Sequence, residues 1–124
     1  MKILIVTISA TVLLGFGCAG SSPPPTQQMA DVQAANRGAN ELGAQKNPKA
    51  QLHLKLAEEQ MKQAKTAMEN DDNESADGLL MRAKADAELA IAVTRADHAR
   101  TEANKAIDRS NAQRSLNSEQ GAPQ

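Results

Sequence analysis

Few side chains in this chain of 124 residues have the types and spacing that catalysis or metal binding requires. The thiol of Cys18, the only cysteine, is the one obvious nucleophile. The two histidines, His53 and His98, have no cysteine or carboxylate cluster that would complete a metal shell. The sequence contains no Ser/His/Asp arrangement and no glycine-rich phosphate loop. We therefore expect no enzyme, no metal site and no cofactor.

The acidic residues do not form a ligand set either. Residues 73–78 (NESADG) resemble the start of a calcium loop, but the closing glutamate would have to stand at position 84, which is Lys84. The acidic pairs at 58–59 and 71–72 are adjacent in sequence, which is typical of a solvated helix face and of a turn. Neither pair has the spacing of a general acid and base.

The residues before Cys18 have the pattern of a secretory signal peptide. Lys2 supplies a charged start, residues 3–14 form an apolar run, and residues 15–17 (GFG) form a small-residue exit. The run is shorter than the stretch of about 20 apolar residues that spans a bilayer. We therefore expect a lipoprotein signal peptide over 1–17.

The junction before Cys18 resembles a bacterial lipobox, in which small residues precede a cysteine and leucines lie just upstream. Here the leucines are residues 13–14, one step further from the cysteine than usual, and Gly15 takes the usual leucine position. The resemblance implies that Cys18 becomes the first mature residue and carries three acyl chains. Two alternatives stay open, namely ordinary secretion with a cut after Ala19 or Gly20, and an uncleaved anchor.

The same resemblance implies an address in the cell. In lipoproteins of Gram-negative bacteria, an aspartate directly after the cysteine retains the protein in the inner membrane. Ala19 is not an aspartate, so the periplasmic face of the outer membrane is implied. Two or more acyl chains anchor a protein stably, which makes the membrane, reached through the lipid on Cys18, an expected partner.

Composition excludes several other partners. The net charge is −1, and no basic patch indicates binding to nucleic acid. The only aromatic residue, Phe16, would leave with the signal peptide, so the mature chain has no ring on which bases or sugars stack. Alanine largely replaces leucine, isoleucine and valine, which favours thin helices whose axes approach closely.

Spacing predicts an all-α fold, either an alanine-rich three-helix bundle or a helical hairpin, with one long C-terminal helix. The helices are expected at about 27–43, 48–69 and 74–115. A tether over 18–28, rich in proline, serine and glycine, precedes the helices. The helical domain is expected over 29–115, and a disordered tail over 116–124 follows it.

Apolar residues recur at alternating steps of three and four, which is the rhythm of one helix face. The expected core stripes are Met29, Val32, Ala35, Ala39 and Leu42; then Ala50, Leu54, Ala57, Met61, Ala64 and Met68; then Ala76, Leu80, Ala83, Ala87 and Ala90. Gly43 suits a helix end, residues 47–48 (NP) a helix start, and residues 70–73 (NDDN) a tight turn. Charged pairs four residues apart are expected on the wet faces: Lys55–Glu59, Glu58–Lys62, Arg82–Asp86 and Lys84–Glu88.

The last helix carries a second stripe, which consists of Leu89, Ala92, Ala96, Ala99, Ala103 and Ala106. Two stripes suit a helix that contacts two neighbours. A hairpin at residue 71 lets the second helix cover the third only to about Arg95, so the remainder should overhang. Two interpretations stay open: a solvated helix, or an interaction seam, formed by Ala92, Ala96, Ala99, Ala103 and Ala106, for a homo-oligomer or another envelope protein.

Several motifs together carry a family resemblance. They are NELGA at 40–44 before Pro48, the acidic pair at 71–72, and AKADAELA at 83–90. The stretch from about 30 to 109 resembles the domain of unknown function DUF4398 of Gram-negative lipoproteins. The resemblance implies an all-helical periplasmic domain without an assigned activity.

Two features of similar lipoproteins bear on peptidoglycan. Some relatives carry an OmpA-like peptidoglycan-binding domain after the helical part, and Braun-type lipoproteins end in a lysine that is linked to peptidoglycan. The sequence ends at Gln124, so we expect no covalent peptidoglycan link.

These features predict an outer-membrane-anchored periplasmic lipoprotein that acts as a non-enzymatic structural or interaction module, a scaffold or adaptor, of the cell envelope. The alternative is a helical binding or carrier module for a hydrophobic ligand or client protein. That alternative depends on Met29, Met61, Met68 and Met81, because methionine side chains adapt to varied apolar surfaces.

Overall fold

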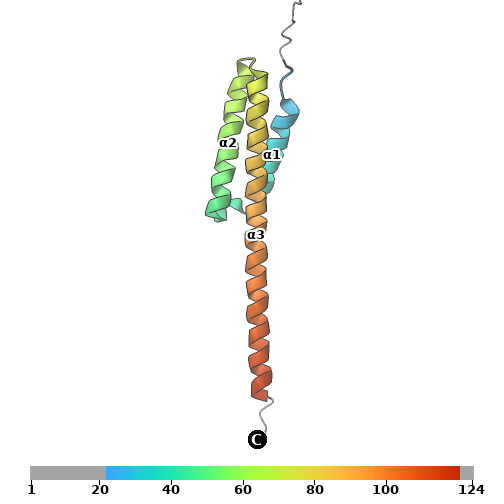
Figure 1. Ribbon diagram of the computed structural model, residues 1–124, viewed down its shortest axis with the longest axis vertical. Helices are drawn as coiled ribbons and strands as arrows, with labels where there is room; N and C mark the ends of the chain where they lie inside the picture. The colour runs from blue at the N-terminus through green and yellow to red at the C-terminus, as the bar shows by residue number, and fades with distance from the viewer. Residues whose placement is uncertain (1–21, 121–124) are drawn as a thin grey trace, which may run out of the picture.

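The computed structural model describes residues 22–120, which form three α-helices and one short 3-10 helix (Figure 1). The elements are α1 (Thr26–Glu41), η1 (Ala44–Lys46), α2 (Pro48–Glu69) and α3 (Asn73–Gln120). Residues 22–120 contain no strand, so the predicted all-α class with one long C-terminal helix is confirmed. Among these residues, no helix is both long and apolar enough to cross a membrane.

The predicted start and stop signals operate where α1 ends and α2 begins. Gly43 has a φ of 86°, a left-handed conformation that glycine adopts without strain, and its N–H donates to the carbonyl of Asn40. The side-chain oxygen of Asn47 accepts from the N–H groups of Lys49 and Ala50, at 3.0 and 3.1 Å. With Pro48 at the first helical position, this arrangement fixes the start of α2.

The turn between α2 and α3 consists of Asn70, Asp71 and Asp72, and α3 begins at Asn73, one residue earlier than predicted. Asp71 has a φ of 58°, a conformation that aspartate tolerates better than most residues. Asp72 Oδ1 accepts from the N–H of Ser75 at 3.1 Å and so caps α3. Hydrogen bonds from the side chain and backbone of Ser75 hold the pKa of the Asp72 carboxyl below its ordinary value.

The core consists mainly of alanine. α3 lies between α1 and α2, and its contact with α2 is the more extensive (Figure 1). The fully enclosed apolar residues are Val32, Ala39, Ala44, Ala50, Leu54, Ala57, Ala64, Ala76, Leu80, Ala83, Ala87 and Ala90. The predicted core stripe of α3 is therefore buried throughout, and most of the α2 stripe is buried with it.

The second stripe of α3 does not make the contact that was predicted for it. Leu89 is 42% exposed and Ala92 is also exposed, so neither packs against a second neighbour. α1 instead meets a different face of α3. There Gln28 Nε2 donates to Asp77 Oδ1 at 2.9 Å, and Lys84 Nζ lies 3.6 Å from Asp31 Oδ2. The prediction was wrong because it counted apolar residues only, whereas α1 is held partly by charged and amide groups.

The burial of α3 ends abruptly at Thr94, whose hydroxyl donates to the carbonyl of Ala90 at 2.8 Å. Every residue from 95 to 119 is exposed. This agrees with the prediction that the second helix covers the third only to about Arg95. We call residues 95–120 the overhang. The helix continues to Gln120 instead of ending at 115, so residues 116–120 are helical and not the predicted tail; residues 121–124 lie outside the described chain.

The tether boundary also needs correction. α1 begins at Thr26, not after residue 28, and Pro25 just before it is buried. Asn73 Nδ2 donates to the carbonyl of Ser22 at 2.7 Å. Residues 22–25 therefore lie against the start of α3, and residues 18–21 of the predicted tether lie outside the described residues.

Amide hydrogen exchange should divide α3 at the end of its buried part. We expect amides between Arg95 and Ser118 to exchange at least about tenfold faster than those between Ala76 and Thr94, because the overhang opens without exposing any buried side chain. Exchange followed by fragment mass spectrometry measures both stretches in one sample. Equal protection along the whole helix would contradict an uncovered overhang.

Candidate functional site: the face of α2 and α3 opposite α1

The predicted site residues fall into two groups. Cys18, the predicted lipidation site, lies outside the described residues. The predicted seam alanines all lie on α3 and are all exposed, so no part of residues 22–119 covers them: Ala92, Ala96, Ala99, Ala103 and Ala106. The seam therefore remains available to another molecule.

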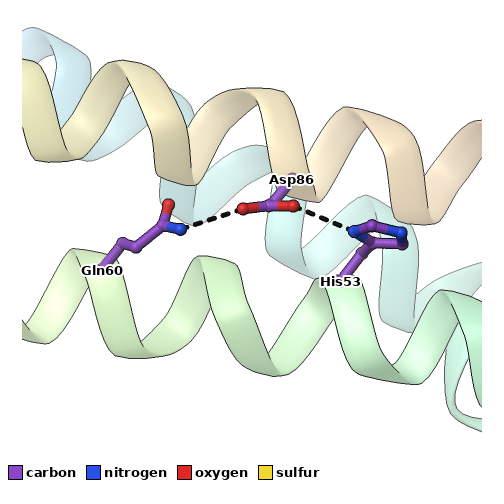
Figure 2. Close-up of polar contacts among 3 residues, drawn as sticks. All are labelled: His53, Gln60 and Asp86. Atoms are coloured by element: carbon purple, nitrogen blue, oxygen red, sulfur yellow. Dashed lines mark hydrogen bonds and ion pairs between the residues drawn. The ribbon is translucent and has the colours of Figure 1, made fainter.

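A polar bridge that was not predicted joins α2 to α3 (Figure 2). His53 Nδ1 lies 2.9 Å from Asp86 Oδ1, and Gln60 Nε2 donates to Asp86 Oδ2 at 3.0 Å. About a fifth of each of the His53 and Asp86 side chains is exposed, at 19% and 20%. In Figure 2, α1 runs behind this bridge, which places the bridge on the face of the α2–α3 pair that α1 does not cover.

The polar bridge fixes how α2 and α3 align along their axes. His53 and Gln60 are seven residues apart, so they stand on one side of α2, two turns from each other. The single carboxylate of Asp86 reaches both only when α3 is in one register. Sequence reasoning missed this contact because it paired Asp86 with Arg82 on the wet face. None of the four predicted pairs forms an ion pair within residues 22–120.

The polar bridge has the two residue types of a catalytic His–Asp couple but not the rest of such a site. Within the described chain, no hydroxyl or thiol hydrogen-bonds to the ring of His53. Residues 22–120 also contain no group of three histidine, cysteine, aspartate or glutamate side chains that could hold a metal ion. His98 stands exposed on the overhang, far along α3 from His53's partner Asp86.

Most of the helical domain matches a known protein family. The family profile for the domain of unknown function DUF4398 matches residues 27–106, which is more than half of the chain. The chain belongs to this family. No curated protein and no solved structure matches it. The matched region of the DUF4398 domain passes Thr94, the last buried residue, and ends at Ala106. The exposed seam is thus part of the family's domain.

Exposed leucines border the polar bridge in this DUF4398 domain. Leu56 stands between His53 and Gln60 on α2 and is 41% exposed. Leu89 follows Asp86 by three residues on α3, which puts it on nearly the same side of its helix. α1 fills one side of the α2–α3 pair, and on the other side these leucines remain open to solvent.

The four methionines that suggested a carrier do not converge on one enclosed cavity. Met29, Met61 and Met68 pack against the core cluster around Val32, and Met81 is 66% exposed. Between α1 and α2 there is an open groove of about 460 Å³, lined by Pro24, Met29, Gln33, Lys65, Met68 and Glu69. Met29, Met61 and Met68 therefore act as packing residues at the edge of the core.

One polar residue lies inside the core itself. Asn36 of α1 is only 7% exposed, and neither Oδ1 nor Nδ2 of its amide has a hydrogen-bond partner. Along α1, it stands between Val32 of one apolar cluster and Ala39 of the other. A buried, unpaired amide lowers stability, so we infer that Asn36 makes the folded domain less stable than an apolar residue at this position would.

Replacing Asn36 tests this inference. We expect Asn36→Ala to raise the free energy of unfolding by about 1–2 kcal/mol, because it removes an unpaired buried amide and favours the helix. Asn36→Asp is the control and should destabilise the protein, since it buries a charge in the same volume. Urea denaturation followed by circular dichroism measures both, and a destabilised Asn36→Ala would contradict the inference.

Removing the carboxylate of the polar bridge should loosen the α2–α3 pair. We expect Asp86→Ala to lower the free energy of unfolding by about 1–3 kcal/mol, because two half-buried side chains lose their partner. Asp108→Ala, on the exposed overhang, is the matched control and should change stability by less than about 0.5 kcal/mol. If the two variants unfold alike, the bridge does not hold the helices in register.

Proposed function

We propose that this DUF4398 protein is a lipoprotein, anchored through Cys18 at the periplasmic face of the outer membrane, that acts as a structural or interaction module of the cell envelope. Its role is to hold an alanine-rich helix face at a distance from the membrane for another envelope component. The proposal assigns it no enzymatic activity.

The overhang is the observation that carries this proposal. At about 1.5 Å per residue, residues 95–120 are about 39 Å of helix. They contribute no buried side chain to the domain, although the family's domain includes them as far as Ala106. A regular helix that does not stabilise its own domain is suited to contact with something outside it.

The structure also supports a lipid anchor at the end of the molecule opposite the overhang. The carbonyl of Ser22 is hydrogen-bonded to Asn73 at the start of α3. Cys18 precedes Ser22 by four residues in the sequence, and four residues of chain span at most about 14 Å. In Figure 1, the start of α1 and the α2–α3 turn lie at one end of the molecule, and the overhang extends from the other. A lipid on Cys18 would therefore keep the turn near the membrane and the overhang away from it.

Metabolic labelling with a palmitate analogue, combined with membrane fractionation, tests the anchor. We expect the wild-type protein to take up label and to fractionate with the outer membrane, and Cys18→Ser to lose both properties because it lacks the thiol. Ala19→Asp is the matched control, since it should keep the label but move the protein to the inner membrane. An unlabelled, soluble wild-type protein would contradict the anchor and favour ordinary secretion.

A further inference from the structure

We propose that α3 pairs with α3 of a second copy of this chain, the two helices running antiparallel with their seams in contact. The proposal deepens the interaction role proposed above, because it identifies the other envelope component as a second copy, and it rests on that role only for its place in the envelope. The pairing itself depends on α3 and not on the lipid, so the two proposals can fail separately.

The seam lies on the side of α3 opposite its buried stripe. Leu89 and Ala92 follow the buried Ala87 and Ala90 by two residues each, which is a little over half a turn of helix. Both are exposed, so neither α1 nor α2 covers this side of α3 beside the bundle. A second helix can therefore lie along the seam both beside the bundle and along the overhang (Figure 1).

An antiparallel second copy matches the residues of the seam well in size. When Ala96 lies level with Ala99 of the second copy, the facing layers are Leu89 with Ala106, Ala92 with Ala103, and Ala96 with Ala99, each formed twice by symmetry. The larger leucine thus meets an alanine at both ends, and alanine meets alanine between them. These layers extend over about 26 Å of close helix contact.

The charges beside the seam favour this register. One edge of the seam carries Glu88, Arg95, Glu102 and Arg109 at intervals of seven residues, and all four are exposed. In the register above, Glu88 faces Arg109 of the second copy, and Arg95 faces Glu102. Glu102 lies 2.9 Å from Lys105 on its own helix, but both side chains are more than half exposed, so the carboxylate can also accept from Arg95.

Exposed apolar side chains continue the same edge beyond the charges. Met81 and Leu116 are 66% and 53% exposed, and in this register they face each other across the pair. Beside Met81 there is an open groove of about 330 Å³ between α1 and α3, lined by Gln28, Asp31, Leu80, Met81, Lys84, Ala85 and Glu88. The edge of the second helix would run along this groove, which extends the contact to about 53 Å.

Alternation of charge along this edge selects one register. A shift of the antiparallel pair by one heptad places Glu88 against Glu102 in one direction, and Arg95 against Arg109 in the other, which is repulsive. A helix of a different protein with edge charges of one sign would likewise repel half of these residues. A second copy carries the complementary sequence of charges in reverse order, so it satisfies all four.

The other edge of the seam decides the orientation. In a parallel pair, this edge of one copy faces the first edge of the other, so Arg95 meets Arg100 and Arg109 meets Arg114. In the antiparallel pair, Arg100 instead faces Val93 of the second copy, and no two arginines face each other. Charge repulsion therefore disfavours the parallel arrangement.

Alanine layers and exposed ion pairs hold the two copies together only weakly. The single chain therefore predominates in dilute solution, where hydrogen exchange and distances within one chain report an uncovered overhang. Anchoring in one membrane raises the local concentration of copies and favours pairing. The two α2–α3 turns lie at opposite ends of the pair, so two anchors in one membrane require the pair to lie along its surface, whereas a single chain holds its overhang away from it.

Cysteine crosslinking in cells tests both orientation and register. One copy carries Ala92→Cys, and a co-expressed copy with a different tag carries Ala103→Cys. We expect a mixed disulfide, because these positions lie level in the pair and a disulfide requires α-carbons within about 7 Å. Neither variant alone should form one at its new cysteine, since two copies of the same position are about 17 Å apart along the axis.

The wild-type chain, whose only cysteine is Cys18, is the control for disulfides that do not involve the seam. A disulfide between two copies of Ala92→Cys would indicate a parallel pair and overturns the proposal. The absence of a mixed disulfide, or adducts with a different protein only, also overturns it.

Charge reversal on one edge tests the ion pairs. Arg95 and Glu102 are exposed on the overhang, so replacing them leaves the core intact. We expect Arg95→Glu, present in both copies, to lower the yield of the mixed disulfide at least about fivefold, and Glu102→Arg to do the same, because like charges then face each other. A copy with Arg95→Glu should pair with a copy carrying Glu102→Arg as well as wild type does, since opposite charges meet again.

Asp108→Arg is the matched control for the reversal of an acidic residue, because Asp108 is exposed on the opposite side of the helix, and it should leave the yield unchanged. If the two reversal variants pair with themselves as well as with each other, the ion pairs do not direct the contact and the proposal fails.

The same disulfide can be followed without the lipid. Concentrated, purified chains with Cys18→Ser and the two seam cysteines should give the mixed disulfide on oxidation, which supports pairing even if palmitate labelling fails. Labelled, membrane-bound chains that give no mixed disulfide would overturn the pairing and leave the anchor in place.

Discussion

The close contact between the alanine stripes of α2 and α3 is the interaction on which the rest of this structure depends. Alanine brings two helices together with little side-chain volume, so the domain is thin and its core contains few large residues. The contact can last only as long as the shorter helix. α2 has 22 residues and α3 has 48, so the hairpin that builds the domain also produces the overhang.

Alanine stripes that repeat every seven residues specify position poorly, because a shift by one heptad places alanine opposite alanine again. The polar groups in and beside the core resolve this ambiguity. Asp86 must meet both His53 and Gln60, and the Asn47 and Asp72 caps fix where α2 and α3 begin. Asn36 lies unpaired in the core, so it lowers stability and has no hydrogen bond that would select this packing.

Much of this fold could be predicted from the sequence, because its causes are local. Glycine at position 43 and Asn-Pro at 47–48 act through their own backbone geometry, and the stripe of α3 follows from helix periodicity. The start of the overhang near Arg95 followed from counting residues on either side of the turn. The long C-terminal helix extends further than predicted, since neither glycine nor proline stops it between 115 and 120.

The contacts that sequence reasoning missed are those between charged or amide groups on different helices. Asp86 looked like a surface residue paired with Arg82, because an i,i+4 pair is visible in sequence while a partner on another helix is not. The same holds for Asp77 and Lys84, which meet α1. The seam alanines all lie exposed on α3, and their exposure alone does not distinguish a docking surface from a solvated helix.

An interaction role for α3 requires that the overhang project as a straight, uncovered helix beyond the bundle. The distance between spin labels at positions 74 and 115, measured by double electron–electron resonance, tests this most directly. A straight α3 places these positions about 62 Å apart, with a narrow distribution. A distribution centred well below that distance would show that the overhang folds back on the domain, and neither the exposed seam nor its docking role would survive.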